Sequence, residues 1–159
     1  MPITLYRIDD RLVHGQVVEA WVPYLKAGEI AVVSDDLSRD LMRQTIMRFA
    51  APEDIALRIL PLSEAPAYLS AADARGPNIL VLLPGLAEAV ELIKKGVKIS
   101  RLNVGGMHYS AGKNLSIGRA IFLNDADCAA LRFLSDSGVV MEGRGVPSDG
   151  PLNLIEAIS

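Results

Sequence analysis

The chain has 159 residues, half of them hydrophobic, and a formal net charge of −3. This length is enough for one domain with its own core, without metals or disulfides. No apolar run approaches the ~20 residues that a membrane-spanning helix needs, and the N-terminus lacks the pattern of a secretory signal. A single cysteine, Cys128, argues against a disulfide framework and favours the cytoplasm, and the lack of a basic block argues against nucleic-acid binding.

Short β-rich runs alternate with helical patterns along the whole chain. Several of these runs are continuously apolar, which is typical of strands buried on both faces. The alternation predicts a single α/β domain over residues 1–159, with an open, mostly parallel central sheet of about seven strands, flanking helices and one or two antiparallel edge strands. The strands are expected at Ile3–Ile8, Ile30–Ser34, Ala56–Leu60, Ile79–Leu83, Arg101–Val104, Ala120–Leu123 and Val139–Glu142.

Apolar residues at helical spacing predict the helices between these strands. The first is expected over Val17–Leu25, where Pro23 should kink or shorten it. The second is expected over Leu37–Phe49, with Asp35 or Asp36 as its cap. Its apolar residues line one face: Leu37, Leu41, Met42, Ile46 and Phe49. The others are expected at Glu64–Ala72, Leu86–Lys95, from Asp125 to Gly138, and Leu152–Ile158.

The most informative segment is the loop IDDRLVHGQ, residues 8–16, between the first strand and the first helix. It places His14 at a helix N-terminus, where free backbone N–H groups and the helix dipole favour a phosphate. An imidazole can carry a phosphoryl group as a covalent intermediate, and Arg11 is placed to bind that group. Asp9 or Asp10 can fix the imidazole tautomer or hold the guanidinium. Each residue also has a structural interpretation: His14 as a structural histidine, Arg11 as a solvated side chain and the aspartates as loop caps.

A second polar segment, NVGGMHYSAGK over residues 103–113, follows the fifth strand. In open α/β sheets ligands bind beyond the carboxyl ends of the strands, so this segment and the His14 loop are expected to form one site. The glycine pair is also typical of a tight turn, and the histidine of an exposed loop. Neither a metal nor a cofactor is expected, because the spacing of a zinc or two-metal site is absent from the sequence. The catalytic candidates are His14, Arg11 and Asp10, and the phosphate-binding candidates are Asp9, Gly15, Gln16, Gly105, Gly106 and His108.

The run from Ile8 to Val17, together with Trp21, resembles the active-site segment of the enzyme IIB component of the bacterial sugar phosphotransferase system, mannose/fructose/sorbose family. The stretches 32–36 and 97–113 are similar to the same family, and the match is colinear. The resemblance implies a cytoplasmic phosphocarrier with an open, mainly parallel α/β sheet. Such a carrier takes a phosphoryl group from a phosphohistidine on a IIA protein. It passes the group to a sugar that enters through the membrane IIC–IID permease.

The resemblance also assigns roles within the active loop. His14 matches the phosphate acceptor of the family, which is phosphorylated at Nδ1, and Arg11 matches an arginine of the same loop. Many relatives carry IIA fused ahead of IIB, whereas this sequence starts at the first IIB strand, so a separate IIA protein is expected. A relay between proteins needs an open rim, and Val13, Met107 and Tyr109 are the apolar contacts expected for IIA.

Three alternative functions stay open at the level of sequence. A histidine phosphatase or mutase is suggested by residues 12–16, although Val13 occupies the place of the arginine in the Arg-His-Gly segment of that superfamily. A receiver-type signalling domain is suggested by the paired acids, although the third strand ends in Leu60-Pro61-Leu62 rather than in a phosphorylatable aspartate. A phosphohistidine protein without a permease would act in regulation rather than in transport.

Overall fold

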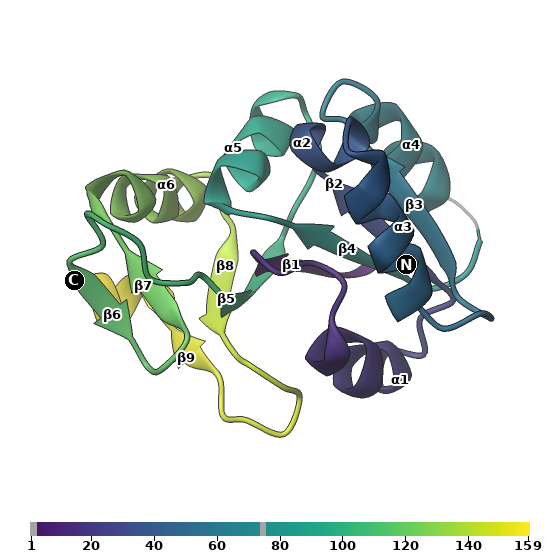
Figure 1. Ribbon diagram of the computed structural model, residues 1–159. Coiled ribbons are helices and arrows are strands. Elements are labelled where there is room, and N and C mark those ends of the chain that lie inside the picture. Colours follow the sequence, from purple (N-terminus) through teal and green to yellow (C-terminus); the bar gives the residue numbers. More distant parts are fainter. Residues whose placement is uncertain (1–2, 74–75) are drawn as a thin grey trace.

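The protein is built on one seven-stranded sheet, seen in a computed structural model that describes residues 3–73 and 76–159 (Figure 1). Its strands are β1 (Ile3–Asp9), β2 (Glu29–Val33), β3 (Ala56–Leu60), β4 (Ile79–Leu83), β5 (Arg101–Gly106), β8 (Val140–Gly143) and β9 (Leu152–Asn153). Their order is β3-β2-β4-β1-β5-β8-β9. All neighbours pair in parallel except β9, which pairs antiparallel with β8. This confirms the predicted fold class.

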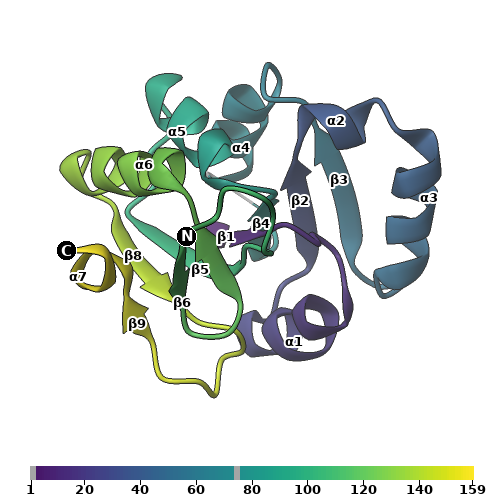
Figure 2. The same cartoon turned by 60° about the vertical axis from the view of Figure 1, so that its left-hand side comes forward.

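Helices cover both faces of the sheet. They are η1 (Val17–Trp21, a π-helix), α1 (Val22–Leu25), α2 (Asp35–Ser38), α3 (Leu41–Ala50), α4 (Ala65–Asp73), α5 (Leu86–Lys94), α6 (Asp125–Asp136) and α7 (Leu154–Ile158). Figure 2 shows α4, α5 and α6 on one face and α1 on the other. Successive side chains of a strand point to opposite faces, so the strands supply two cores. Ile30 and Val32 belong to the core under η1 and α1, whereas Ala31 and Val33 belong to the core under α4, α5 and α6.

The helix after β1 is distorted just before Pro23 and ends soon after it, as the sequence predicted. A π-helical turn over Val17–Trp21 precedes the proline, and α1 ends at Leu25, before Lys26 in the left-handed region. Proline has no N–H group and its ring clashes with the preceding turn, so a widened turn relieves the conflict.

The predicted second helix is two helices, and its predicted caps are wrong. The Ser34 hydroxyl accepts a hydrogen bond from the Leu37 N–H at 3.1 Å and caps α2, while the Asp40 carboxylate accepts from the Arg43 N–H at 3.1 Å and caps α3. Asp35 instead accepts a hydrogen bond from the Leu62 N–H at 2.8 Å. Each helix thus has its own cap, and the apolar run is divided where Asp40 begins the second helix.

Two expected elements near the C-terminus form, the strand outside the central sheet and the helix two residues later than predicted. The strand expected at 120–123 is β7 (Ile121–Leu123), which pairs with β6 (Leu115–Ile117) in a separate antiparallel hairpin. The helix expected at Leu152–Ile158 is preceded by β9, whose antiparallel pairing with β8 depends on a distant strand. Within residues 3–73 and 76–159, no helix is long and apolar enough to cross a membrane.

Candidate functional site

The site lies at the carboxyl end of β1, between β4 and β5. From β1 the chain crosses to β2, which lies on the β4 side of β1. On the other side of β1 lies β5, from which the sheet continues to β8. Such a point in the strand order is the usual ligand site of an open α/β sheet. The Asp10 N–H donates to the Gly106 carbonyl at 3.1 Å, so the segments after β1 and β5 lie together as the sequence predicted.

The loop after β1 is fixed by an unusual backbone conformation. Leu12 has a φ of 60° although it is not a glycine, and its side chain is buried. The Leu12 N–H donates to the Asp9 carbonyl at 2.9 Å, which closes a tight turn. Such a conformation persists only where surrounding contacts enforce it, and it is characteristic of functional sites. Here burial of Leu12 and Val13 anchors the loop that presents His14.

His14 stands directly before the first helical turn. Its carbonyl accepts the first helical hydrogen bond, from the Val18 N–H at 3.0 Å. Its ring Nε2 lies 2.9 Å from Asp9 Oδ2, and its side chain is 15% exposed. A carboxylate only accepts hydrogen bonds, so Nε2 carries the proton of this bond and Nδ1 keeps its lone pair. The free ring nitrogen is therefore Nδ1.

Asp9 is the centre of the site rather than a peripheral phosphate ligand. Its fully buried carboxylate accepts hydrogen bonds from His14, from Arg7 Nη2 at 3.2 Å and from the Arg11 backbone N–H at 3.1 Å. The side-chain Nε of Arg11 lies 3.5 Å from the same carboxylate. Four groups thus hold one carboxylate in a single orientation, which in turn orients the imidazole.

Arg7 is the member of the site that sequence reasoning missed. Its guanidinium is fully buried and donates to the Arg144 carbonyl at 2.8 Å and to the Gly145 carbonyl at 3.0 Å. It also bonds to Asn103 Oδ1 and lies 4.9 Å from the centre of the Trp21 ring. Burial lowers the pKa of Arg7, and the Asp9 carboxylate, its partner in a 3.2 Å ion pair, opposes that shift. The available signal was an arginine inside an otherwise apolar strand.

Gly105 and Gly106 lie in β5 and leave space for this buried pair. A Cβ on Gly105 would lie 1.8 Å from Arg7 Nη2, and a Cβ on Gly106 would lie 3.2 Å from Asp9 Oδ1. The glycine pair is therefore neither a tight turn nor a loop, because β5 extends through it. A role of these glycines in binding phosphate stays a prediction.

Arg11, Gly15 and Gln16 form the open side of the site. The Arg11 side chain is 44% exposed, and its Nη2 donates to Gln16 Oε1 at 3.2 Å. No atom lies within 4 Å of the position of a Cβ on Gly15. The first helical turn thus begins directly after His14, and the partly exposed Arg11 guanidinium contacts Gln16 and the Asp9 carboxylate, an arrangement that suits an anionic group.

Asp10 contacts the segment after β5 rather than His14. Its carboxylate accepts a hydrogen bond from the His108 N–H at 2.7 Å and also contacts His108 Nδ1. The two loops are thereby tied together across the sheet edge. Farther along the same segment, Lys113 Nζ pairs with Asp127 Oδ2 at 2.5 Å and so faces α6.

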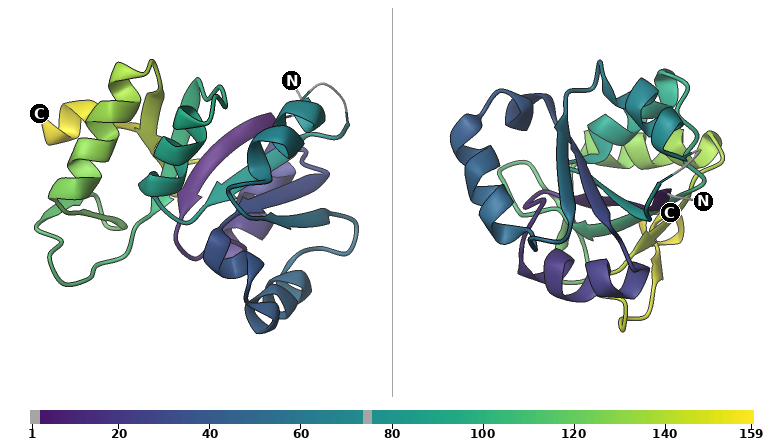
Figure 3. Two further views of the ribbon diagram at one scale, coloured as in Figure 1. Left: turned by 90° about the horizontal axis from the view of Figure 1, so that it is seen from above. Right: turned by 90° about the vertical axis from the view of Figure 1, so that its right-hand side faces the viewer.

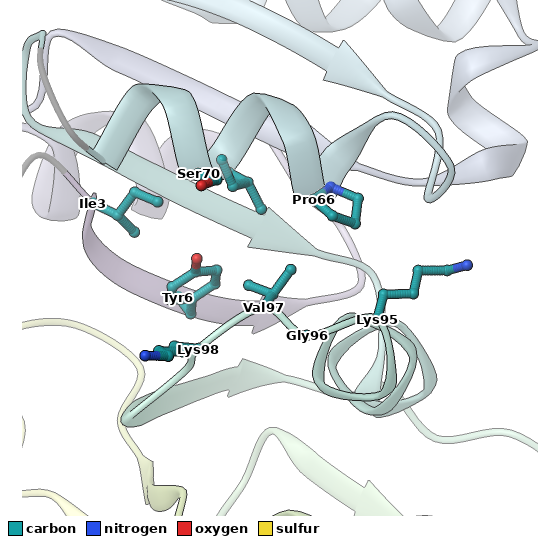
Figure 4. Close-up of a pocket in the computed structure, with 9 residues that line it drawn as sticks. Ile3, Tyr6, Pro66, Ser70, Lys95, Gly96, Val97 and Lys98 are labelled. Carbon is teal, nitrogen blue, oxygen red and sulfur yellow. The ribbon is translucent and has the colours of Figure 1, made fainter.

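The expectation that Val13, Met107 and Tyr109 form an exposed apolar rim around His14 is largely wrong. Val13 and Met107 are each only 6% exposed because they pack into the two cores, whereas Tyr109 is 67% exposed. A pocket of about 470 Å³ lies elsewhere, beside Ile3 and Tyr6 toward the other end of β1 (Figure 4). Across residues 3–73 and 76–159, no group of three histidine, cysteine, aspartate or glutamate residues is arranged to hold a metal ion.

Comparison with known proteins agrees with this fold. The family described as the sorbose subfamily IIB component of the phosphotransferase system (PTS) matches residues 3–159, and the chain belongs to this family. It is 34% identical to the sorbose-specific EIIB component of Klebsiella pneumoniae, over 100% of this chain and 96% of that protein. It is 31% identical to the mannose-specific EIIAB component of Escherichia coli (strain K12), over 100% of this chain and 49% of that protein.

A solved structure shows the same architecture. The crystal structure of the IIBSor domain of the sorbose permease from Klebsiella pneumoniae superimposes with a TM-score of 0.91 at 34% identity, covering 99% of this chain and 96% of that chain. The family resemblance inferred from the first loop is therefore confirmed. The histidine phosphatase and receiver interpretations are left without support.

Proposed function

We propose that this chain is a cytoplasmic phosphocarrier that accepts a phosphoryl group on Nδ1 of His14 from a phosphohistidine on a IIA protein. It then transfers the group to a sugar of the mannose, fructose or sorbose type at a membrane IIC/IID permease. The activity is that of a protein-Nπ-phosphohistidine–sugar phosphotransferase. The observation that carries this proposal is the 2.9 Å contact between His14 Nε2 and Asp9 Oδ2, which leaves Nδ1 as the nucleophile.

The chemistry needs positioning more than acid–base catalysis. The Nδ1 lone pair attacks the phosphorus of the donor phosphohistidine, the donor P–N bond breaks, and the electron pair returns to the donor ring. The migrating group is anionic throughout, so fixed positive charge and N–H donors lower the barrier. Arg11 and the amides of Gly15 and Gln16 have this role in the proposal, because Arg11 is partly exposed beside the Asp9 carboxylate that holds the ring and the two amides follow His14 directly in the chain. In the second transfer a sugar hydroxyl attacks the phosphorus, the P–Nδ1 bond breaks with its electron pair returning to Nδ1, and the hydroxyl proton passes to solvent.

Asp9 and Asp10 have different parts in this proposal. Asp9 fixes the ring and stabilises the positive charge that the imidazole develops while it is phosphorylated. Asp10 holds His108, and with it the segment after β5, beside the transfer site. His108 is therefore a wall of the site in this proposal rather than a second acceptor.

Phosphorylation by the relay tests the proposal. The protein is incubated with labelled phosphoenolpyruvate, the two general phosphotransferase proteins and a IIA protein, and the labelled residue is mapped. We expect one label, on His14, which is lost in acid and retained in base, and no label in His14→Gln. Full labelling of His14→Gln would refute the assignment, and label on His108 would move the acceptor. Loss of the label to added sugar only when IIC/IID vesicles are present would separate transport from a purely regulatory role.

A further inference from the structure

Helix α3 turns its apolar side toward solvent. Leu41, Met42, Ile46 and Phe49 are 78%, 76%, 62% and 87% exposed, whereas only Met47 of this helix is buried. Isolated exposed apolar residues are ordinary, but a contiguous set marks an interaction site. We call Leu41, Met42, Ile46 and Phe49 the α3 stripe.

The stripe has the composition of a protein interface with a defined charge. At about 100° per residue, Met42 and Phe49 lie roughly opposite Met47 and Ile46 lies about 100° from it. Arg43 and Arg48 lie on the two sides of this group. The ten residues of α3 include no carboxylate. Aromatic residues, methionine and arginine are the types enriched in protein interfaces. A matching surface is therefore apolar at its centre and acidic at its rim.

The stripe is close enough to His14 for one partner to cover both. The inner residue of α3, Met47, belongs to the same core cluster as Leu12 and Val13 of the active loop. Only β4 separates β2, which leads into α2 and α3, from β1, a distance of about 10 Å between β1 and β2. Figures 2 and 3 show α3 and the loop after β1 on the same side of the molecule.

The structure leads us to infer that the α3 stripe is the docking surface for the phosphoryl-donor protein, an inference that rests on the proposed function. The donor must bring its phosphohistidine to Nδ1 of His14, so its footprint includes this edge of the sheet. A transient interface of about 600 Å² per partner extends roughly 14 Å from its centre, which is enough to include α3. Val13 and Met107 are buried and leave the apolar contact to other residues. Arg43, together with Arg48, whose Nη1 also donates to the Leu57 carbonyl at 3.2 Å, then favours a donor whose apolar surface is rimmed by carboxylates.

Transfer kinetics with single-site variants test this surface. The donor is the A domain of the mannose-specific EIIAB component of Escherichia coli, charged from phosphoenolpyruvate and supplied over a range of concentrations. Ile46→Asp and Phe49→Asp should each lower kcat/KM for transfer to His14 about tenfold or more, while kcat at saturating donor changes less than about twofold. Phe133→Asp makes the same change on α6, on the opposite face of the sheet, and should leave both values unchanged.

A small chemical donor separates failure of docking from failure of the site. Phosphoramidate needs no docking surface, so it should label His14 equally in the wild type, Ile46→Asp and Phe49→Asp. Lack of His14 labelling in the wild type by this reagent would count against the proposed function itself. Unchanged kcat/KM in both variants, with His14 labelled normally, would overturn the docking inference. So would a stripe-dependent dimer in sedimentation, or stripe-dependent binding to phosphatidylglycerol vesicles, because either would assign the stripe to a different occupant.

Discussion

The two sides of the His14 ring differ in almost every physical respect. On the Nε2 side, Asp9, Arg7 and Asn103 are fully buried and bonded to one another or to backbone carbonyls. Toward solvent, the Arg11 side chain is 44% exposed, although its Nε lies 3.5 Å from the Asp9 carboxylate, and Gly15 borders open space. A buried ion pair rarely adds net stability, but removing one partner is costly, so the closed side is rigid. The rigid side orients the ring, whereas the open side stays free for a phosphoryl group and for the protein that delivers it.

The largest expected effect is on the closed side. Arg7→Met should lower the free energy of unfolding by about 3–5 kcal/mol, because it leaves the Asp9 carboxylate buried without its counter-ion. Urea unfolding monitored by circular dichroism measures this change. A loss below about 1 kcal/mol would mean that Asp9 is compensated without Arg7, and the contrast between the two sides would fail.

On the open side the expected effect is on rate. Arg11→Ala should slow single-turnover transfer to His14 about 10²- to 10³-fold, the typical cost of removing one donor to a developing anion, with little change in the thermal midpoint. Arg11→Lys keeps the charge but loses the planar pair of N–H groups, so only partial rescue is expected. Transfer by folded Arg11→Ala at the wild-type rate would remove Arg11 from the mechanism.

Gly105 and Gly15 allow the same substitution to be compared in a filled and in an open part of the site. Gly105→Ala should cost about 1–3 kcal/mol of stability, because the added Cβ would occupy the place of the Arg7 guanidinium. Gly15→Ala adds the same methyl group in open space and should stay within about 0.5 kcal/mol. Equal thermal midpoints for the two variants would contradict the packing described for β5.

The smallest expected effect is on the thermal midpoint and concerns Glu88, a carboxyl group with two aspartates nearby. Burial raises the pKa of Glu88 in the first turn of α5, and the nearby Asp35 and Asp36 add to the shift. A raised pKa in the folded state means that stability falls as pH rises through that pKa. Glu88→Gln should therefore raise the thermal midpoint at pH 7 by on the order of 1–3 °C, and the difference should vanish below the ordinary pKa of glutamate. A difference that grew toward low pH would show the opposite shift.

The site residues that lie close together in the sequence could be identified from the sequence alone. His14, Asp9 and Arg11 share one loop, and the βαβ pattern places that loop at the carboxyl edge of the sheet. Arg7 could not be assigned in this way, because its partners come from β5 and from residues 144–145. The function of Gly105 as space for a guanidinium likewise depends on the register between β1 and β5.

The errors in the predicted helices and strands also arise from contacts that the sequence pattern does not show. The periodicity of Leu37–Phe49 is continuous, and the break between α2 and α3 depends on Asp40, which caps a new helix within this run. The same periodicity placed Leu41, Met42, Ile46 and Phe49 on one face but did not show whether that face is buried. In the structure it is the exposed α3 stripe, and the second core receives only Met47 from α3. Strand β9 has two residues and forms only through its pairing with β8.

The central claim is that Asp9 occupies Nε2 of His14 and thereby leaves Nδ1 to carry the phosphoryl group. Two-bond ¹H–¹⁵N correlation spectra of protein labelled with ¹⁵N-histidine, before and after phosphorylation, test it directly. The account predicts a proton on Nε2, in the bond to Asp9, in the free protein, with phosphate on Nδ1 afterwards. Phosphate on Nε2, or an Nδ1-protonated ring in the free protein, would contradict it.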